Sequence, residues 1–137
     1  MKLTRALVPL ALTLVASAAF TTQSLNAQGT GAYTAAQASA GGKIFAAQCS
    51  MCHGVKLEGI SGPPLAGADF MSKWTGQTAD DLRDVIATQM PLTSPGSLKP
   101  SEVLEVLSYI LQQNKYPAGD SELTAAKTKT VKIAKQG

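Results

Sequence analysis

The feature that most constrains this chain is the pentapeptide Cys49-Ser50-Met51-Cys52-His53. Its pattern, C-x-x-C-H, is typical of the attachment site of a c-type haem. Two thiols three positions apart can each add to one vinyl group of the same porphyrin. The next residue, His53, then lies under the ring, where its imidazole can bind the iron. Because the chain has two cysteines and one histidine, this motif holds all of its thiols and its imidazole. We therefore predict that Cys49, Cys52 and His53 bind one covalent haem c.

Three other uses of the two cysteines fit the sequence less well. A disulfide between Cys49 and Cys52 would close too small a loop to stabilise the fold much. A thioredoxin-like redox pair is expected within a β-α-β pattern, which the sequence lacks. A zinc site would need further cysteine or histidine ligands, and the chain has none.

The composition fits a small domain built around a large cofactor. The chain has 137 residues, enough for one domain, and only 5% of them are aromatic. A small chain with so few aromatic residues has little large apolar area of its own to bury. A haem at the centre would supply what the side chains lack.

The first residues have the pattern of a secretory signal peptide. Basic residues Lys2 and Arg5 precede an apolar run over residues 6–20, which is shorter than the roughly 20 residues of a membrane span. We predict a signal peptide over residues 1–27, with cleavage after Ala18 and a retained membrane anchor as alternatives. Export to the periplasm fits the haem motif, since haem c is attached outside the cytoplasm.

Charge is unevenly distributed along the predicted mature chain. Loss of Lys2 and Arg5 lowers the formal net charge from +3 to +1. The last part of the chain is basic, with Glu122 as its one acid after residue 121 and with Lys127, Lys129, Lys132 and Lys135. We expect residues 120–137 to form a disordered basic tail. No basic stripe runs along the rest of the chain, so we expect no nucleic-acid partner.

Helix signals divide the remaining chain into three helices and two loops. Thr34 and Gln37 match a capping box and predict a helix from there to about Gln48. Thr78 is a good N-cap for a second helix that ends before Pro91. Pro100 suits the first turn of a third helix, which runs to near Asn114. The glycine- and proline-rich residues 54–74 predict a loop that wraps around the haem edge. These signals indicate an all-α domain over residues 34–119, preceded by a flexible segment over residues 28–33.

The second axial ligand of the iron is predicted to be a methionine. His53 is the only histidine, so a second histidine ligand is excluded within one chain. Met1 is lost with the signal peptide, and Met51 lies between the two cysteines and cannot cross the ring plane. We favour Met90, which heads a proline-rich loop free of helical constraint, and Met71 is the alternative. Met90 could otherwise be a core residue at a helix end.

Other side chains have two possible roles. The indole N–H of Trp74 could bind a haem propionate or could accompany ordinary core packing, and the sequence favours neither. Lys56 and Lys73 could lie on the rim of an exposed haem edge. We favour ordinary solvated surface charges for both.

These features resemble class I c-type cytochromes of the small bacterial periplasmic kind, over about residues 34–114. Gly41 and Phe45 precede Cys49 at the spacing usual in that family. The sequence Gly62-Pro63-Pro64-Leu65 resembles the family's Gly-Pro-x-Leu turn. The resemblance implies that the carbonyl of Pro63 accepts the free N–H of His53.

The same resemblance extends to the end of the domain. Met90-Pro91 resembles the family's ligand loop, and Tyr109 with Val106 occupies the place where the last helix crosses the first at its glycine. The resemblance implies a cytochrome c fold of three to five short helices and loops wrapped around one covalent haem. It also implies iron ligation by His53 and Met90.

The function that this resemblance implies is electron transfer rather than enzymatic catalysis. Histidine and methionine ligation raises the reduction potential and leaves no open site on the iron. We expect a monomeric periplasmic carrier between a dehydrogenase and an oxidase or another cytochrome. The pattern from Gly62 to Trp74, with Met90-Pro91 and Pro95-Gly96-Ser97-Leu98, resembles cytochromes that serve quinoprotein alcohol dehydrogenases. Two alternatives are a haem enzyme or gas-binding cytochrome with a displaceable sixth ligand, and a membrane-anchored subunit of a larger redox complex.

Overall fold

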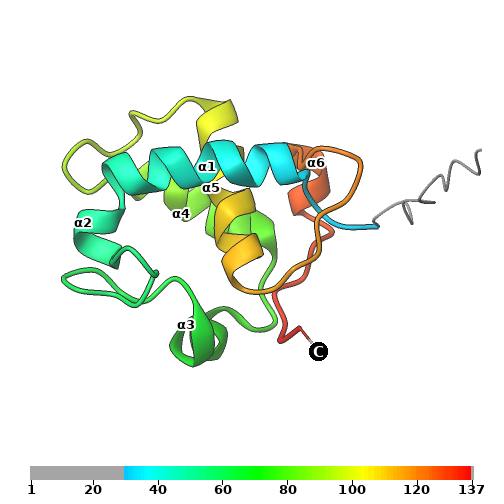
Figure 1. The fold of residues 1–137 in the computed structure, drawn as a ribbon, viewed down its shortest axis with the longest axis horizontal. Helices are drawn as coiled ribbons and strands as arrows, with labels where there is room; N and C mark the ends of the chain where they lie inside the picture. The colour runs from blue at the N-terminus through cyan, green and yellow to red at the C-terminus, as the bar shows by residue number, and fades with distance from the viewer. Residues whose placement is uncertain (1–29, 137) are drawn as a thin grey trace, which may run out of the picture.

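The computed structural model describes residues 30–136, and these residues form helices and loops without any extended strand (Figure 1). The helices are α1 (Ala35–Gln48), α2 (Ser50–His53), α3 (Gly67–Trp74), α4 (Ala79–Gln89), α5 (Pro100–Gln113) and α6 (Ala125–Thr128). The predicted all-α fold is therefore confirmed. More helices are present than the three to five predicted, because α2 and α6 are single turns of 4 residues. Such turns are too short to show a helical period. The predicted signal peptide, residues 1–27, lies outside the described residues.

The three predicted helix starts are confirmed. The Thr34 hydroxyl accepts from the Gln37 backbone N–H at 3.2 Å, and the Gln37 side chain accepts from the Thr34 backbone at 3.3 Å. Thr78 and Asp81 make the same reciprocal pair at the start of α4. Helix α5 begins at Pro100, whose missing N–H would have had no partner in the first turn.

Gly41 lets α1 and α5 cross with their backbones in contact. A Cβ atom on Gly41 would overlap the backbone carbonyl of Glu105 and crowd the amide nitrogen of Val106. One turn further along α1, the ring of Phe45 packs against that of Tyr109 in a tilted arrangement, with 5.3 Å between ring centroids. The predicted crossing of the first and last helices at this glycine is therefore present.

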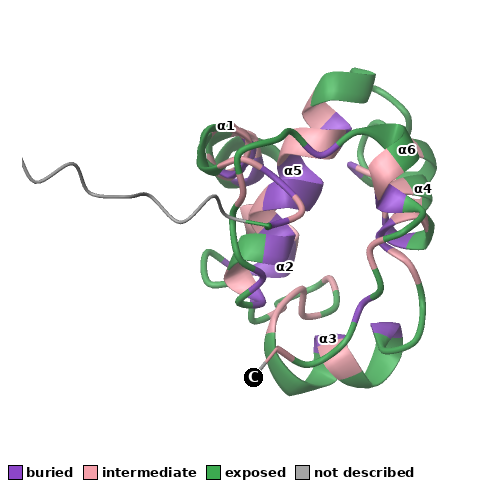
Figure 2. Ribbon diagram, turned by 90° about the vertical axis from the view of Figure 1, so that its right-hand side faces the viewer, coloured by how far each residue is buried: buried purple, intermediate pink, exposed green. Residues whose placement is uncertain are grey.

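Helix α5 lies between α1 and α4 and supplies much of the core (Figure 2). Its buried apolar side chains recur at helical spacing, so they form one face. They are Val103, Val106, Leu107, Ile110 and Leu111. Phe45 of α1 and Leu82 and Ile86 of α4 complete the core around them.

The predicted loop over residues 54–74 is only partly correct, because its last 8 residues form α3. Phe70 and Trp74 are spaced four residues apart, so both fall on one face of this helix, and both are buried. Asp69 lies in its first turn, where a carboxylate is favoured by the helix dipole. A single pair of apolar residues is too short a pattern to predict a helix when glycines and prolines precede it, so the sequence indicated a loop.

The predicted disordered tail, residues 120–137, is wrong for the described part of that segment. Residues 120–136 include α6 and then run toward the connection between α3 and α4 (Figure 1). The backbone of Ile133 donates to Gln77 and accepts from Gly76, at 2.8 and 2.9 Å. Leu123, Thr128 and Ile133 are buried. These three residues share no helical or strand period, and their partners lie far away in the sequence.

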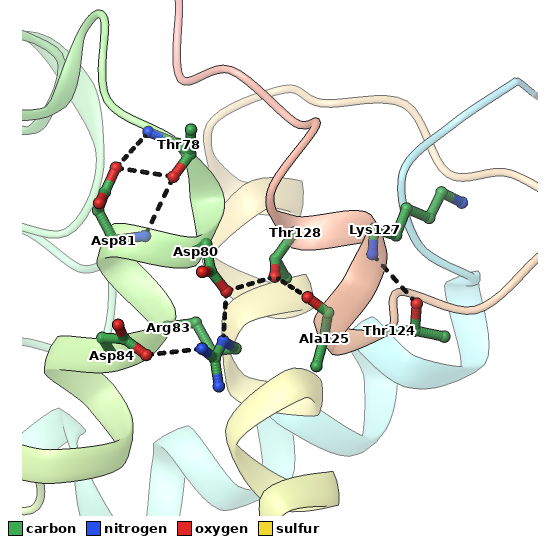
Figure 3. Close-up of polar contacts among 9 residues, drawn as sticks. All are labelled: Thr78, Asp80, Asp81, Arg83, Asp84, Thr124, Ala125, Lys127 and Thr128. Carbon is green, nitrogen blue, oxygen red and sulfur yellow. Dashed lines mark hydrogen bonds and ion pairs between the residues drawn. The ribbon is translucent and has the colours of Figure 1, made fainter.

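Asp80 of α4 accepts one hydrogen bond from α6, which joins the two helices, and a second from within α4 (Figure 3). One oxygen of its carboxylate accepts from Arg83 Nε at 2.7 Å and from the Thr128 hydroxyl at 2.8 Å. The hydrogen bond from Arg83, and then the one from Thr128, hold the pKa of Asp80 below its ordinary value. Arg83 also donates to Asp84 at 2.6 Å.

Replacing Gly41 with alanine should force α1 and α5 apart. We expect Gly41→Ala to lower the free energy of unfolding by about 1–3 kcal/mol, the usual cost of overpacking a close contact. Gly42→Ala is the matched control, because its new Cβ would meet only the movable ring of Tyr109, at 3.2 Å. Denaturant unfolding of the two variants measures the difference. Equal stability of both variants would contradict the close crossing.

The contribution of Asp80 to stability should depend on pH. Its lowered pKa means that its charge stabilises the fold above the unfolded-state pKa of about 4, and that this contribution is lost as the pH falls through the lowered value. Asp80→Asn should therefore be less stable than the natural protein at neutral pH, and the gap should close in acid. Asp84→Asn is the control, since its side chain is 64% exposed and such pairs contribute little. A gap that stays constant in acid would refute the role of the charge.

Candidate functional site

The Cys49–His53 motif occupies a tight turn at the end of α1. Cys49 caps α1 through its N–H, which donates to Phe45 at 2.9 Å, and its carbonyl accepts from the His53 N–H at 2.9 Å. Helix α2 then carries Cys52 and His53. Cys49, Cys52 and His53 all line one cavity, as the motif predicted for a shared cofactor.

His53 is oriented by a single hydrogen bond. Its Nδ1 lies 2.8 Å from the carbonyl oxygen of Pro63. A carbonyl can only accept, so Nδ1 must carry a proton, and in the neutral imidazole Nε2 then keeps its lone pair. An imidazole in this tautomer is ready to bind a metal through Nε2, with the carbonyl holding the ring. The contact between His53 and Pro63 is the one that the sequence resemblance implied.

Gly62 lets the following loop lie flat against the imidazole. A Cβ on Gly62 would be 2.9 Å from Cε1 and 3.0 Å from Nδ1 of His53. The Gly62 N–H donates to the carbonyl of Cys52 at 2.9 Å, and the Gly59 N–H donates to the carbonyl of His53 at 2.7 Å. The loop is therefore folded back onto the turn that carries the motif.

The other side of the cavity is formed by α4 and the loop after it. Met90 is half-buried and lines the cavity, and so do Pro91 and Leu92. Met71 packs against the core and is absent from the cavity wall. Met51 lines the cavity mouth but is 87% exposed. Among the described methionines, Met90 thus combines partial burial with a position on the cavity wall.

Trp74 and Lys73 also line this cavity. Trp74 is buried, and Lys73 Nζ lies 5.6 Å from the centre of its ring, within the range of a cation–π contact. Within residues 30–136, no protein acceptor takes a hydrogen bond from the Trp74 indole. Lys56 is exposed and does not line the cavity, which agrees with an ordinary surface charge.

The cavity suits a large, flat, apolar group. Its volume is about 640 Å³, which lies within the usual range for cofactor sites. Its walls are mainly apolar, and α1, α4 and α5 contribute Phe45, Leu82, Val85, Ile86, Val106 and Ile110 to them. Two thiols, one imidazole and the thioethers of Met51 and Met90 line this apolar space, a donor set that fits a covalently bound haem.

The Cys49 thiol does not have the lowered pKa that is typical of a reactive redox cysteine. Both cysteines are free and half-buried. Burial, and to a smaller degree the neighbouring Cys52, raises the pKa of Cys49 to about 11. Reactive cysteines instead have lowered pKa values. In addition, residues 30–136 hold no group of three or more histidine, cysteine or acidic side chains that could bind a bare metal ion.

Sequence reasoning missed two parts of the site. Leu92 lines the cavity mouth although it is 76% exposed, and Asn114 binds the loop that holds Pro63. An isolated leucine in a loop and an asparagine at a helix end have many uses, so the sequence contained no signal for either role.

None of the helices in residues 30–136 has the length and apolar character of a membrane span.

Known proteins share parts of this sequence and fold. Residues 36–110, more than half of the chain, match the protein family described as cytochrome c oxidase, cbb3-type, subunit III. No curated protein sequence matches the chain. A solved structure with a similar fold is the sulfane dehydrogenase SoxCD from Paracoccus pantotrophus, with 24% identity and a TM-score of 0.59. The match covers 70% of this chain and 52% of that one, so this chain spans about half the length of the solved chain.

The structural similarity supports the cytochrome c fold, and the family match supports the chemistry of the motif. The fold and family agree with the cavity that surrounds Cys49, Cys52 and His53. The chain therefore belongs to this family and is a class I-like c-type cytochrome, which implies covalent haem c and electron transfer through its iron.

Proposed function

We propose that this protein is a periplasmic carrier of single electrons between a dehydrogenase and a terminal oxidase or another cytochrome. One haem c would be attached through Cys49 and Cys52, with His53 and Met90 as the two iron ligands. The observation that carries the proposal is that His53 and Met90 come from separate elements and line the same apolar cavity. The single C-x-x-C-H motif in 137 residues supports one haem for this chain.

The residues around His53 would tune the iron ligand. Haem, when bound, supplies reversible one-electron chemistry at its iron. The Pro63 carbonyl holds the Nδ1 proton of His53, which fixes the ring and makes Nε2 a stronger donor. Gly62 leaves space for this arrangement, because any side chain there would collide with the imidazole.

Met90 would be the second protein ligand of the iron and would raise its reduction potential, as methionine does together with histidine. If His53 and Met90 both bound the iron, they would leave no open site for a substrate, so we propose a carrier rather than an enzyme. Apolar walls from α4 and α5 exclude water, and the Trp74 indole is a free donor for a propionate at the same cavity.

Electrons would enter and leave at the cavity mouth. Met51 and Leu92 line the cavity and are 87% and 76% exposed, so apolar surface borders its opening. Lys73 is also exposed and lines the cavity. A mainly apolar rim suits brief contacts with several partners. A quinoprotein dehydrogenase is our proposed donor, from the resemblance of the loop sequences.

Export would bring the protein to the periplasm. The support is the signal-peptide pattern of residues 1–27 and the haem motif itself. A subunit of a larger redox complex, anchored by a retained N-terminal segment, is the second candidate. The description of the matching family as an oxidase subunit favours that candidate. The mass of the mature N-terminus separates the two.

Replacing Met90 tests the proposed ligand set. Met90→Ala should abolish the thioether–iron absorption band near the red end of the visible spectrum. It should also lower the midpoint potential by on the order of 0.1 V, since axial ligands set potentials over about 0.8 V. Met71→Ala is the matched control and should change neither. Both variants should keep the mass of one covalent haem, because Cys49 and Cys52 are untouched. The reverse pattern would assign the ligand to Met71.

Kinetics with a partner test the carrier role. The oxidised protein should be reduced when a periplasmic fraction of its host is supplied with a dehydrogenase substrate, and then be reoxidised by membranes of that host. Leu92→Asp should slow the second-order reduction several-fold, because it places a charge at the apolar mouth. Ser101→Asp adds the same charge at an exposed site outside the cavity and should not. No reduction by the fraction, together with peroxide turnover or tight carbon monoxide binding, would overturn the carrier role.

A further inference from the structure

Asn114 makes an unusual set of hydrogen bonds at the end of α5. It is only 6% exposed, and its carboxamide has three backbone partners. Its nitrogen donates to the carbonyls of Ile110 and Leu65, both at 2.9 Å, and its oxygen accepts from the Gly67 N–H at 3.2 Å. The bond to Ile110 lies within α5 and finishes the helix. The other two reach a segment more than 40 residues earlier in the chain.

That segment directly follows the carbonyl that holds His53. Pro63 lies between Gly62, whose N–H is bonded to Cys52, and Leu65, whose N–H is bonded to Leu57 at 2.8 Å. Every other hydrogen bond of residues 54–67 to a partner outside its own helix stays within residues 50–67. Within the described structure, Asn114 is thus the residue that ties this loop by hydrogen bonds to a distant core helix.

The partners also determine which amide orientation is present. Two carbonyls face the nitrogen and one N–H faces the oxygen, so the opposite orientation would place oxygen against oxygen. An aspartate of the same shape could keep the bond from Gly67 but would lose both donors and repel the two carbonyls. Position 114 therefore requires an amide, because a carboxylate of the same shape could not make the same hydrogen bonds.

We propose that Asn114 is a positioning residue for the haem iron, which it affects through the Pro63 carbonyl and His53. By holding Leu65 and Gly67 against α5, it keeps the Pro63 carbonyl 2.8 Å from His53 Nδ1 and so maintains the donor strength of Nε2. This inference rests on the proposed role of His53 as an iron ligand. A looser loop weakens the bond to Nδ1, makes the imidazole a poorer donor to iron(III), and raises the midpoint potential.

If Asn114 only capped α5, its replacement would have a different effect. A cap affects the stability of the helix, but not the proton on His53. The discriminating quantity is therefore the exchange rate of the His53 Nδ1 proton, measured by NMR on the reduced holoprotein. The midpoint potential from a redox titration is the second quantity.

The test compares three variants of the holoprotein. Asn114→Ala should speed exchange of the His53 Nδ1 proton at least tenfold (about 1.4 kcal/mol of lost protection) and raise the midpoint potential, while the thioether band stays. Asn114→Asp keeps the side-chain shape, so it guards against a failure of the alanine variant to fold, and it should speed exchange in the same way. Ser108→Ala is the control. Ser108 is also buried on α5, but its hydroxyl bonds only to Leu104 of the same helix.

Two results would overturn the proposal. One is an unchanged exchange rate and potential in both Asn114 variants. The other is an equal change in Ser108→Ala at the same loss of stability, because it would show a general effect of a weakened α5. Failure of the proposed function would be seen in a different measurement. The unaltered holoprotein would then lack the absorption spectrum of histidine–methionine ligation, whatever the Asn114 variants show.

Discussion

The contact on which the structure depends is the crossing of α1 and α5 at Gly41. Because Gly41 has no side chain, the backbones of the two helices touch at Glu105 and Val106. Helix α1 ends in the Cys49–His53 turn, so the crossing sets where that turn lies. Helix α5 supplies Val106 and Ile110 to the cavity wall. A single close approach therefore places the residues that would attach the haem beside the apolar surface that would cover it.

From this crossing, the polar contacts of the site form a short series. His53 is held by Pro63, the Pro63 segment is folded back onto Cys52, and its far end is bound by Asn114 at the end of α5. Helix α5 therefore takes part at both ends of this series, in the crossing with α1 and in the contact of Asn114 with the loop. Such a closed set of contacts keeps an imidazole in one tautomer and one orientation, which is what a metal ligand requires. These contacts also fix the path of a loop that has many glycines and prolines and little regular structure of its own.

The C-terminal segment, residues 120–136, has the composition of a disordered tail but makes defined contacts with the rest of the fold. Its lysines and small residues resemble those of a disordered tail, and its buried side chains follow no regular period. Yet Ile133 pairs with Gln77 and Gly76, and Thr128 donates to Asp80. These partners are supplied by the start of α4 and the turn before it. Order in this segment comes from contacts with a surface that exists only after the rest of the chain has folded.

The sequence alone determined the chemistry and the long helices of this protein. The C-x-x-C-H spacing specifies covalent haem, and capping residues and apolar periods define α1, α4 and α5, because those signals are local. Met90 was favoured over Met71 by its place in a proline-rich loop, and its position on the cavity wall agrees. Only the tertiary structure decided the course of the C-terminal segment, the exposure of Leu92 and the contacts of Asn114. Each of these depends on residues that are distant in the sequence, and no local pattern records which distant surface a side chain will meet.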